Sequence, residues 1–329
     1  MLISNLSLDK SDLNPYIWST LLKKIEQNLK ENKKIILYLN KRWNFSSLIC
    51  TDCQYLYKCD NCDVALTVHR YPEKLSCHIC WVTKNIPLSC KKCAGNNLKK
   101  IWVWTQQIEE SLNKYFSESF IFRFDLDSVK NKTDKKQALE NLEKADIIIG
   151  TKMITTGFDF KSVWLIWVIL IEQELSFPFY NTEEKAYINI KQLLGRWERM
   201  GEKTDFVLQT FIPENNLIKI ITEMNYKDFF IETLNERKLF NYPPFTEIAI
   251  LEYRDKNQTK AFDFMQNLKN KLDILNNQKN FEIILNKEAF KKYNQYYFKI
   301  VIKWDNLREF LKNIKKEIFK NSNLSLSFS

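Results

Sequence analysis

The eight cysteines of this chain form four C-x-x-C pairs that all lie between residues 50 and 93. Two thiolates three residues apart on a tight turn can bind one metal ion, and two such turns complete a tetrahedral four-cysteine site. Four pairs therefore predict two structural zinc ions. A redox dithiol needs only one such pair at the start of a helix, and an iron–sulfur centre is the other alternative. The number and spacing of the pairs favour zinc.

Four pairs can be joined into two sites in three ways. Only five residues separate Cys53 from Cys59, whereas the fourteen between Cys62 and Cys77 suit a zinc-ribbon hairpin. We therefore favour a nested arrangement, and we expect His69 and His78 not to bind metal. One zinc would bind Cys59, Cys62, Cys77 and Cys80, and the other would bind Cys50, Cys53, Cys90 and Cys93.

Hydropathy and charge lead us to expect a cytoplasmic protein with a polyanionic partner. The longest apolar run, Val163 to Ile171, is half the length of a membrane span, and the first residues have no signal-peptide pattern. We therefore expect no membrane partner, and reduced thiols that bind metal. The net charge of +10 and the pI near 9.0 favour nucleic acid.

Apolar periodicity predicts alternating strands and helices, the pattern of a parallel sheet with helices on both faces. The cysteine block interrupts this pattern, so we expect it to be an insertion. Helices are predicted at 14–30, 105–116, 135–144 and 183–194, and strands at 34–40, 101–104, 120–127, 145–150, 163–171 and 206–211.

A second, smaller domain is predicted after the Tyr-Pro-Pro-Phe segment at 242–245. Residues 218–238 are mostly helical in pattern, and strands at 248–253, 281–285 and 296–303 alternate with helices at 260–272 and 305–320, as in a ferredoxin-like α+β fold. The fold class is therefore α/β, with an inserted two-zinc ribbon module and a small α+β domain. The expected domains are 1–49 and 98–240 for the parallel sheet, 50–97 for the insertion and 241–329 for the α+β domain.

Two further segments have the composition of phosphate-binding elements. Residues 150–160, GTKMITTGFDF, follow a predicted strand at its carboxyl end, where α/β proteins bind ligands, although such a turn can also be purely structural. Residues 192–199, QLLGRWER, end a predicted helix with two arginines three residues apart. Arginine side chains suit phosphoryl groups, and a solvated basic helix end is the alternative.

Together and in this order, these segments resemble the second helicase lobe of the PriA family of replication-restart helicases (primosomal protein N′), from Ile35 to Phe245. YLNKRW at 38–43 resembles the family's strand followed by N-R-R-G, and CDNCDVALTVHR at 59–70 with CHIC at 77–80 matches its zinc region. The two phosphate-type segments match its motifs V and VI. ERKLFNYPPF at 236–245 matches the entry to its C-terminal domain.

The resemblance implies roles for the matching residues. Gly150, Thr151, Gly157 and Asp159 would couple the nucleotide to single-stranded DNA, and Gln192, Arg196 and Arg199 would face the γ-phosphate of ATP. The zinc insertion, with the nested pairing that the family also has, would contact the displaced strand and partner proteins at a stalled, forked DNA. The C-terminal domain would bind DNA and help recruit the primosome proteins that load the replicative helicase. The implied activity is that of a superfamily 2 helicase, an ATPase that unwinds DNA 3′ to 5′.

The sequence also departs from the family. No G-x-x-x-x-G-K-[ST] and no D-E-x-H segment occurs in it, and those parts hold the phosphates, Mg²⁺ and the attacking water. We therefore expect ATP and Mg²⁺ to bind only with a first lobe that these residues lack, and the chain alone neither to hydrolyse ATP nor to unwind DNA. The alternative is a non-catalytic zinc-ribbon DNA-binding or scaffold protein. Thr156 and Phe158 replace the family's lysine and histidine in motif V, and Glu198 lies between the arginines of motif VI.

Tryptophan stands where the resemblance implies glycine. The chain has 9 tryptophans and 5 glycines, whereas average composition predicts roughly 23 glycines. Trp81 follows Cys80, where a knuckle turns with positive φ and a bulky side chain is strained by about 1–2 kcal/mol; the turn around Trp102 and Trp104 is expected to have the same need. Base stacking on exposed indoles is the alternative. We hypothesise that UGA codons read as glycine by the source organism were translated here as tryptophan, at Trp43, Trp81, Trp102, Trp104, Trp167 and the small-residue position Trp197.

Overall fold

The computed structural model of this chain describes residues 1–6, 16–40, 46–70, 73–101, 103–125, 132–155, 163–198, 204–223, 226–276, 281–287, 289–292, 294–304, 307–312 and 321–328. The chain divides into two compact units. The first contains Met1–Tyr57, Ala65–Leu75 and Asn85–Tyr226, and the second contains Lys58–Val64, Ser76–Lys84 and Lys227–Ser329. The cysteine block therefore contributes residues to both units, and the functional boundaries expected at 50–97 and 241–329 stay predictions.

The first unit is built on a six-stranded sheet in which every neighbouring pair of strands is parallel. The strand order is β1-β11-β10-β2-β9-β8. The central strands β2 and β9 are almost entirely buried, as expected when both faces of a parallel sheet are covered. The predicted parallel sheet is thus confirmed. Its strands are β1 (Leu2–Asn5), β2 (Lys34–Tyr38), β8 (Ile121–Phe124), β9 (Ile147–Gly150), β10 (Val163–Val168) and β11 (Asp205–Thr210).

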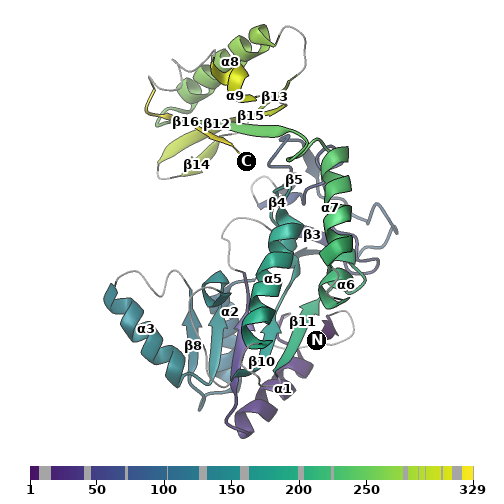
Figure 1. Ribbon diagram of the computed structural model, residues 1–329, viewed down its shortest axis with the longest axis vertical. Coiled ribbons are helices and arrows are strands. Elements are labelled where there is room, and N and C mark those ends of the chain that lie inside the picture. The colour runs from purple at the N-terminus through teal and green to yellow at the C-terminus, as the bar shows by residue number, and fades with distance from the viewer. Residues whose placement is uncertain are drawn as a thin grey trace. The chain divides into compact units, whose positions relative to one another are not determined.

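Amphipathic helices connect these strands (Figure 1). In α1, Leu21 and Ile25 are one helical turn apart and both are fully buried. In α2, Ile108 and Leu112 repeat that spacing and burial. No helix among the described ranges is both long and apolar enough to cross a membrane. The connecting helices are α1 (Ser19–Lys30), α2 (Thr105–Tyr115), α3 (Lys132–Lys144), α4 (Glu172–Leu175) and α5 (Thr182–Glu198), and α6 (Asn216–Glu223) follows β11.

Several element ends differ from the sequence pattern. Helix α1 begins at Ser19, because Trp18 has an extended backbone. The strand expected at 101–104 lies earlier, as β7 (Leu98–Ile101), and Trp104 already caps α2. The apolar run from Val163 is a strand only to Val168, since the chain turns into α4 at the edge of the sheet. Strand β1 was not predicted, because four residues at a sheet edge give no period to recognise.

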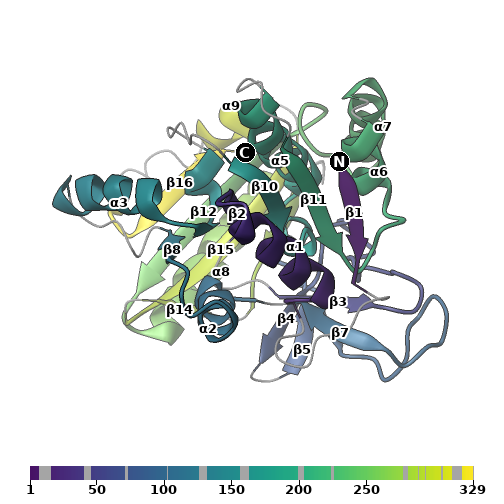
Figure 2. The ribbon, with the colours of Figure 1, turned by 90° about the horizontal axis from the view of Figure 1, so that it is seen from below.

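Short antiparallel strands support the cysteine block. Strand β3 (Ser47–Cys50) pairs with β7, and β4 (Thr67–Arg70), β5 (Glu73–Ser76) and β6 (Thr83–Asn85) form a three-stranded sheet. Figure 2 shows β3 beside β7 and β4 beside β5. The β3–β7 pair brings the Cys50/Cys53 turn near the Cys90/Cys93 turn, and β4 and β5 lie between the Cys59/Cys62 and Cys77/Cys80 turns along the chain.

The C-terminal part of the second unit has the predicted ferredoxin-like order of elements. Helix α7 (Tyr226–Leu239) leads into the sheet β13-β15-β12-β16, in which β14 also pairs with β15. The described strand pairs of this sheet are antiparallel, and α8 and α9 pack on one face (Figure 1). The elements are β12 (Glu247–Asp255), α8 (Gln258–Leu275), β13 (Glu282–Leu285), β14 (Phe290–Lys292), β15 (Gln295–Trp304), α9 (Leu307–Lys312) and β16 (Leu324–Phe328).

The tryptophan positions differ in what their backbone requires. Trp81 has φ of 60°, which confirms the predicted positive φ at this position. Trp104 has φ of −107°, so the expectation of a glycine-like conformation there is wrong: the residue caps α2 in extended backbone. Trp167 is buried in β10 and donates from its indole Nε1 to Gln209 at 3.0 Å. Trp43 and Trp102 lie outside the described residues, as does the side chain of Trp197.

Two candidate metal centres and the carboxyl edge of the parallel sheet

The eight cysteines gather into two groups of four, each with all its Sγ atoms within 4.8 Å of one another. We call Cys50, Cys53, Cys90 and Cys93 the outer quartet, and Cys59, Cys62, Cys77 and Cys80 the inner quartet. This is the nested arrangement that the spacing predicted. His69 and His78 belong to neither quartet.

The sulfur positions fit a tetrahedral metal ion. Sγ–Sγ distances are 3.7 Å for Cys50–Cys93 and 3.6 Å for Cys53–Cys90 in the outer quartet, and 3.5 Å for Cys59–Cys80 in the inner quartet. Four sulfurs at about 2.3 Å from a zinc ion lie about 3.8 Å apart, whereas a disulfide holds them about 2.05 Å apart. The quartets are therefore metal-type clusters of thiols and not disulfides.

All four C-x-x-C pairs adopt the same local turn. The amide of each first cysteine donates to the carbonyl five residues later, as from Cys59 to Val64 at 2.9 Å and from Cys77 to Val82 at 2.9 Å. The residue after each second cysteine has a positive φ: 63° at Gln54, 48° at Asp63, 60° at Trp81 and 59° at Ala94. This reversal brings the two sulfurs of a pair to one side of the turn.

Amide hydrogens also point at the sulfurs. Ile79 N donates to Cys77 Sγ and Lys92 N donates to Cys90 Sγ, both at 3.4 Å, and Gly95 N donates to Cys93 Sγ at 3.4 Å. Such donors stabilise a thiolate, which is the form that binds metal.

Burial and hydrogen bonds between the thiols shift the pKa values of several cysteines in opposite directions. Burial raises the pKa of Cys53 to about 12. In the inner quartet, hydrogen bonds from Cys62 and Cys77 lower the pKa of Cys59 to about 2, and those same bonds raise the pKa values of the two donors. The Cys59 thiolate is thus stabilised by protonated neighbours, and binding of a divalent cation to the quartet releases protons from its ligands.

Known proteins match the cysteine block and most of the remaining chain. The family model described as the PriA DNA helicase Cys-rich region domain matches residues 59–82, which include the whole inner quartet. The replication restart protein PriA of Bacillus subtilis is 30% identical over 243 residues, which cover 73% of this chain and 30% of the relative. PriA of Borreliella burgdorferi is 31% identical over 74% of this chain and 37% of the relative. PriA of Thermotoga maritima is 27% identical over 90% of this chain and 40% of the relative.

The chain belongs to the PriA family. It spans between 30% and 40% of the length of these PriA relatives. Its metal-type quartets agree with the Cys-rich region of that family, which is consistent with two zinc ions.

Residues that match PriA motif V begin at the carboxyl end of β9. Gly150 is the last residue of that strand, and an added Cβ would overlap the buried Ile154 side chain, so glycine lets the turn close. Thr151 is buried beside it. Gly157 and Asp159 lie outside the described residues, so their predicted role stays a prediction.

Residues that match PriA motif VI lie on α5. The helix packs through Ala186, Ile190 and Leu193, while Gln192 is exposed on another side. An added Cβ at Gly195 would meet no described atom within 4 Å. Arg196 belongs to this helix, its side chain lies outside the described part, and Arg199 is outside the described residues. Their ATP-facing role stays a prediction.

A buried carboxylate that sequence reasoning missed joins β2 to α5. Glu174 accepts hydrogen bonds from Tyr38 Oη at 2.6 Å, Asn40 Nδ2 at 2.7 Å and Asn189 Nδ2 at 3.1 Å. Asn40 lies in the segment that resembles the PriA N-R-R-G motif, and Asn189 lies one turn before Gln192. Glu174 therefore fixes the helix of motif VI relative to that segment. The available signal was an acidic pair directly after a buried apolar strand.

The second acid of that pair, Glu172, is completely buried. Its Oε1 accepts from Thr210 Oγ1 at 2.7 Å and from the Phe211 amide at 2.5 Å, whereas Oε2 has no hydrogen-bond partner in the described structure. Burial raises the pKa of Glu172 to about 7. The side chain connects α4 to the end of β11.

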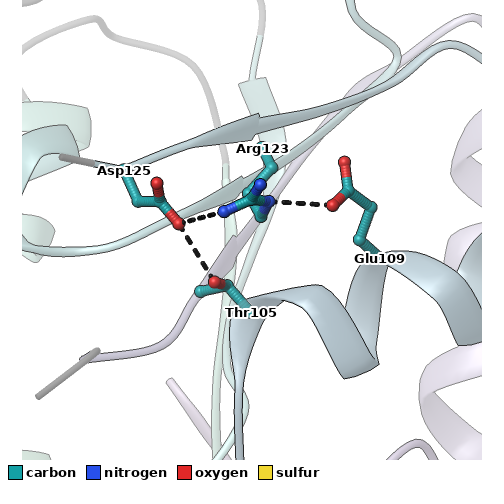
Figure 3. A network of polar contacts seen from close by, with 4 residues as sticks. All are labelled: Thr105, Glu109, Arg123 and Asp125. Carbon is teal, nitrogen blue, oxygen red and sulfur yellow. Dashed lines mark hydrogen bonds and ion pairs between the residues drawn. The ribbon is translucent and has the colours of Figure 1, made fainter. Parts of the chain in front are cut away.

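A further polar network holds α2 to the end of β8 (Figure 3). Asp125, at 1% exposure, accepts from Arg123 Nη1 at 2.6 Å and from Thr105 Oγ1 at 3.1 Å. Arg123 Nε donates to Glu109 Oε2 at 2.8 Å. Since Thr105 is the first residue of α2, the network fixes where this helix begins.

Proposed function

We propose that this chain is the part of a replication-restart helicase that contains the second helicase lobe, a two-zinc DNA-facing module and the C-terminal domain. The observation that carries the proposal is the pair of nested four-cysteine clusters inserted between β2 and α2 of a parallel α/β sheet in a chain of the PriA family. In this proposal the chain binds forked and single-stranded DNA in the cytoplasm, where thiols stay reduced.

ATP and Mg²⁺ enter the proposal only with a first lobe. Phosphoryl transfer needs a phosphate-binding loop and Mg²⁺ ligands, and the 329 residues contain neither of the corresponding motifs. Gln192, Arg196 and Arg199 would then act on a γ-phosphate held by that lobe. Primosome proteins and the machinery that loads the replicative helicase are the proposed protein partners.

The net charge of the chain stays positive when both quartets bind zinc, which favours binding to DNA. Two zinc ions and eight thiolates together add four negative charges to the formal +10. We therefore expect binding to a fork-shaped DNA that weakens steeply between about 50 and 200 mM salt. Fluorescence anisotropy over a salt series measures this, with a blunt duplex of equal length as the reference. An affinity that does not change with salt would contradict DNA binding.

The catalytic part of the proposal is tested by adding the separately purified ATP-binding lobe of a PriA relative. We expect the mixture to hydrolyse ATP when DNA is present. The rate of hydrolysis should fall about a thousandfold in Arg196→Ala and in Arg199→Ala, which is the size of effect known for an arginine finger. Lys191→Ala is the matched control, because Lys191 is a cation of the same helix whose ammonium lies 5.7 Å from the Tyr187 ring centroid.

The alternative is a non-catalytic zinc-ribbon protein that binds DNA as a scaffold. It predicts salt-dependent DNA binding without any hydrolysis in the mixture, and no effect of the two arginine variants beyond weaker DNA binding. Hydrolysis that depends on Arg196 excludes this alternative.

A further inference from the structure

The inner quartet and the C-terminal domain belong to one compact unit. The second unit joins Lys58–Val64 and Ser76–Lys84, which contain all four inner cysteines, to Lys227–Ser329. The outer quartet lies wholly in the first unit. The two metal centres therefore have different structural partners, although the cysteine turns that form them are alike.

Tyr242 makes the contact between the inner quartet and the C-terminal domain. Its side chain is 4% exposed, and its hydroxyl donates to the carbonyl oxygen of Cys62 at 2.7 Å. The backbone of Tyr242 is fixed by its own amide, which donates to Arg237 O at 2.7 Å at the end of α7. A rigid aromatic side chain between α7 and β12 thus binds the main chain of a metal ligand.

Lys303 of β15 packs against the ring of the same tyrosine. It is only 5% exposed, and its ammonium lies 4.6 Å from the centroid of the Tyr242 ring. The carboxylate of Glu282, itself 56% exposed, is 3.7 Å away. A buried ammonium is costly unless negative charge lies near it. A zinc ion with four thiolates carries two net negative charges, and Tyr242 contacts both the main chain of its ligand Cys62 and the Lys303 ammonium.

We propose that the inner metal centre is the docking site of the C-terminal domain. Metal in the inner quartet and the docked domain then stabilise each other through Tyr242 and Lys303. A ligand that binds only the docked form stabilises that form, and docking must in turn strengthen binding of the ligand. Loss of metal from the inner quartet would then release the C-terminal sheet while the outer quartet keeps its ion.

The first test uses the full chain loaded with two zinc ions. We expect Tyr242→Phe, which keeps the ring and removes the hydroxyl, to speed the loss of one zinc to a coloured chelator by about three- to tenfold, the ratio expected for one buried hydrogen bond. Alkylation of the released thiols followed by peptide mass spectrometry identifies the site. The alkylated cysteines should be those of the inner quartet.

Matched variants separate this coupling from a general loss of stability. Tyr253→Phe removes a buried hydroxyl from β12 that contacts Asp255 at 3.4 Å, and should leave both zinc ions unaffected. Tyr57→Phe removes the hydroxyl that accepts from the Lys91 amide at 3.3 Å in the outer knuckle, and should affect only the outer zinc. Lys303→Met should speed loss of the inner zinc. Lys299→Met is its control: it lies on the same strand as Lys303 and breaks an ion pair with Glu252 of β12, and it should not change the loss of zinc.

The converse readout is hydrogen exchange of the C-terminal sheet. When the inner zinc alone has been removed, amides of β12 and β15 should exchange faster, and zinc addition should restore their protection. Outer-zinc retention reports that the first unit of each variant is folded. Unchanged release rates in both Tyr242→Phe and Lys303→Met, or unchanged exchange in β12 and β15 after inner-zinc loss, would overturn the proposal.

Discussion

Trp81 has two unfavourable features at one position. Its φ of 60° is a conformation in which any side chain crowds the backbone, and its indole Nε1 is buried without a hydrogen-bond partner in the described structure. Ala94 occupies the equivalent position of another knuckle with nearly the same φ and only a methyl group. Glycine would relieve both features of Trp81, because it has no Cβ and no donor to bury.

We therefore predict that Trp81→Gly raises the free energy of unfolding by about 1 kcal/mol or more. Urea unfolding of the zinc-loaded protein measures it. Ala94→Gly is the control and should change stability by less than about 1 kcal/mol, since only backbone strain is relieved there. An unchanged or lower stability of Trp81→Gly would count against strain at this residue.

The hypothesis of UGA read as glycine has a direct test at the same residue. Peptide mass spectrometry of the native protein should find glycine at position 81, and tryptophan there refutes it. Trp167 does not show the strain found at Trp81, because its indole is buried and hydrogen-bonded to Gln209. The strain argument therefore applies to Trp81 and not to every tryptophan.

Glu172 gives a pH dependence whose sign follows from its burial. The folded pKa of about 7 lies above the ordinary value of 4.5, so between these two values the folded protein binds more protons than the unfolded chain. Stability then falls as pH rises through this window, by about 3 kcal/mol at most. Glu172→Gln removes the titratable carboxyl group and with it this pH dependence. The variant should gain stability over the unmodified chain from pH 6 to pH 8, as measured by urea unfolding at both values, and parallel pH profiles would contradict the assignment.

At the scale of elements, the start of α2 is held by a charge network as well as by a capping side chain. Gln107 Oε1 accepts from the Trp104 amide at 3.2 Å, while Thr105, Arg123 and Asp125 join the first turn to β8. The spacing of apolar residues predicted both the helix and the strand from the sequence. It did not predict which polar residues join them, because the contact spans about twenty positions.

We predict that Asp125→Asn destabilises the first unit by about 2 kcal/mol, the range for hydrogen bonds to a charged group. The neutral amide keeps the shape of the side chain but leaves Arg123 with Glu109 as its remaining described carboxylate partner. Glu109→Gln is the matched control and should cost less, because Glu109 is 28% exposed and Asp125 is 1% exposed. Thermal unfolding compares them, and equal losses would show that burial does not decide the effect.

At the scale of the whole molecule, the parallel sheet is stabilised by an apolar core. Ile36, Leu37, Ile148, Ile149 and Ile166 are fully buried in its central strands, and none of the cysteines lies among them. The cysteine turns, by contrast, are connected by strands of only three or four residues, so we expect the metal to contribute much of their stability.

We therefore predict two zinc ions per chain by elemental analysis, and removal of both by a strong chelator without loss of the sheet. Far-ultraviolet circular dichroism should keep most of its helical signal, while the cysteines become reactive to a thiol reagent. Cys93→Ser, at the exposed outer ligand, should lower the metal content to about one ion. Collapse of the helical signal on chelation would show that the metal centres support the sheet as well.

The sequence determined most helices and strands of the two sheets and the identity of the metal ligands, because periodicity and C-x-x-C spacing are local. Spacing alone was sufficient for the nested quartets, since a short link between Cys53 and Cys59 leaves little room for the first turn to fold back. Only the tertiary structure decided that the inner quartet shares a unit with the C-terminal domain, that Glu174 joins β2 to α5, and that Tyr242 binds the carbonyl of Cys62. The partners in these contacts are separated by 134 to 180 residues, except for the Asn189 contact fifteen residues from Glu174. Burial selects such pairs only after the chain has folded, and no period in the sequence records them.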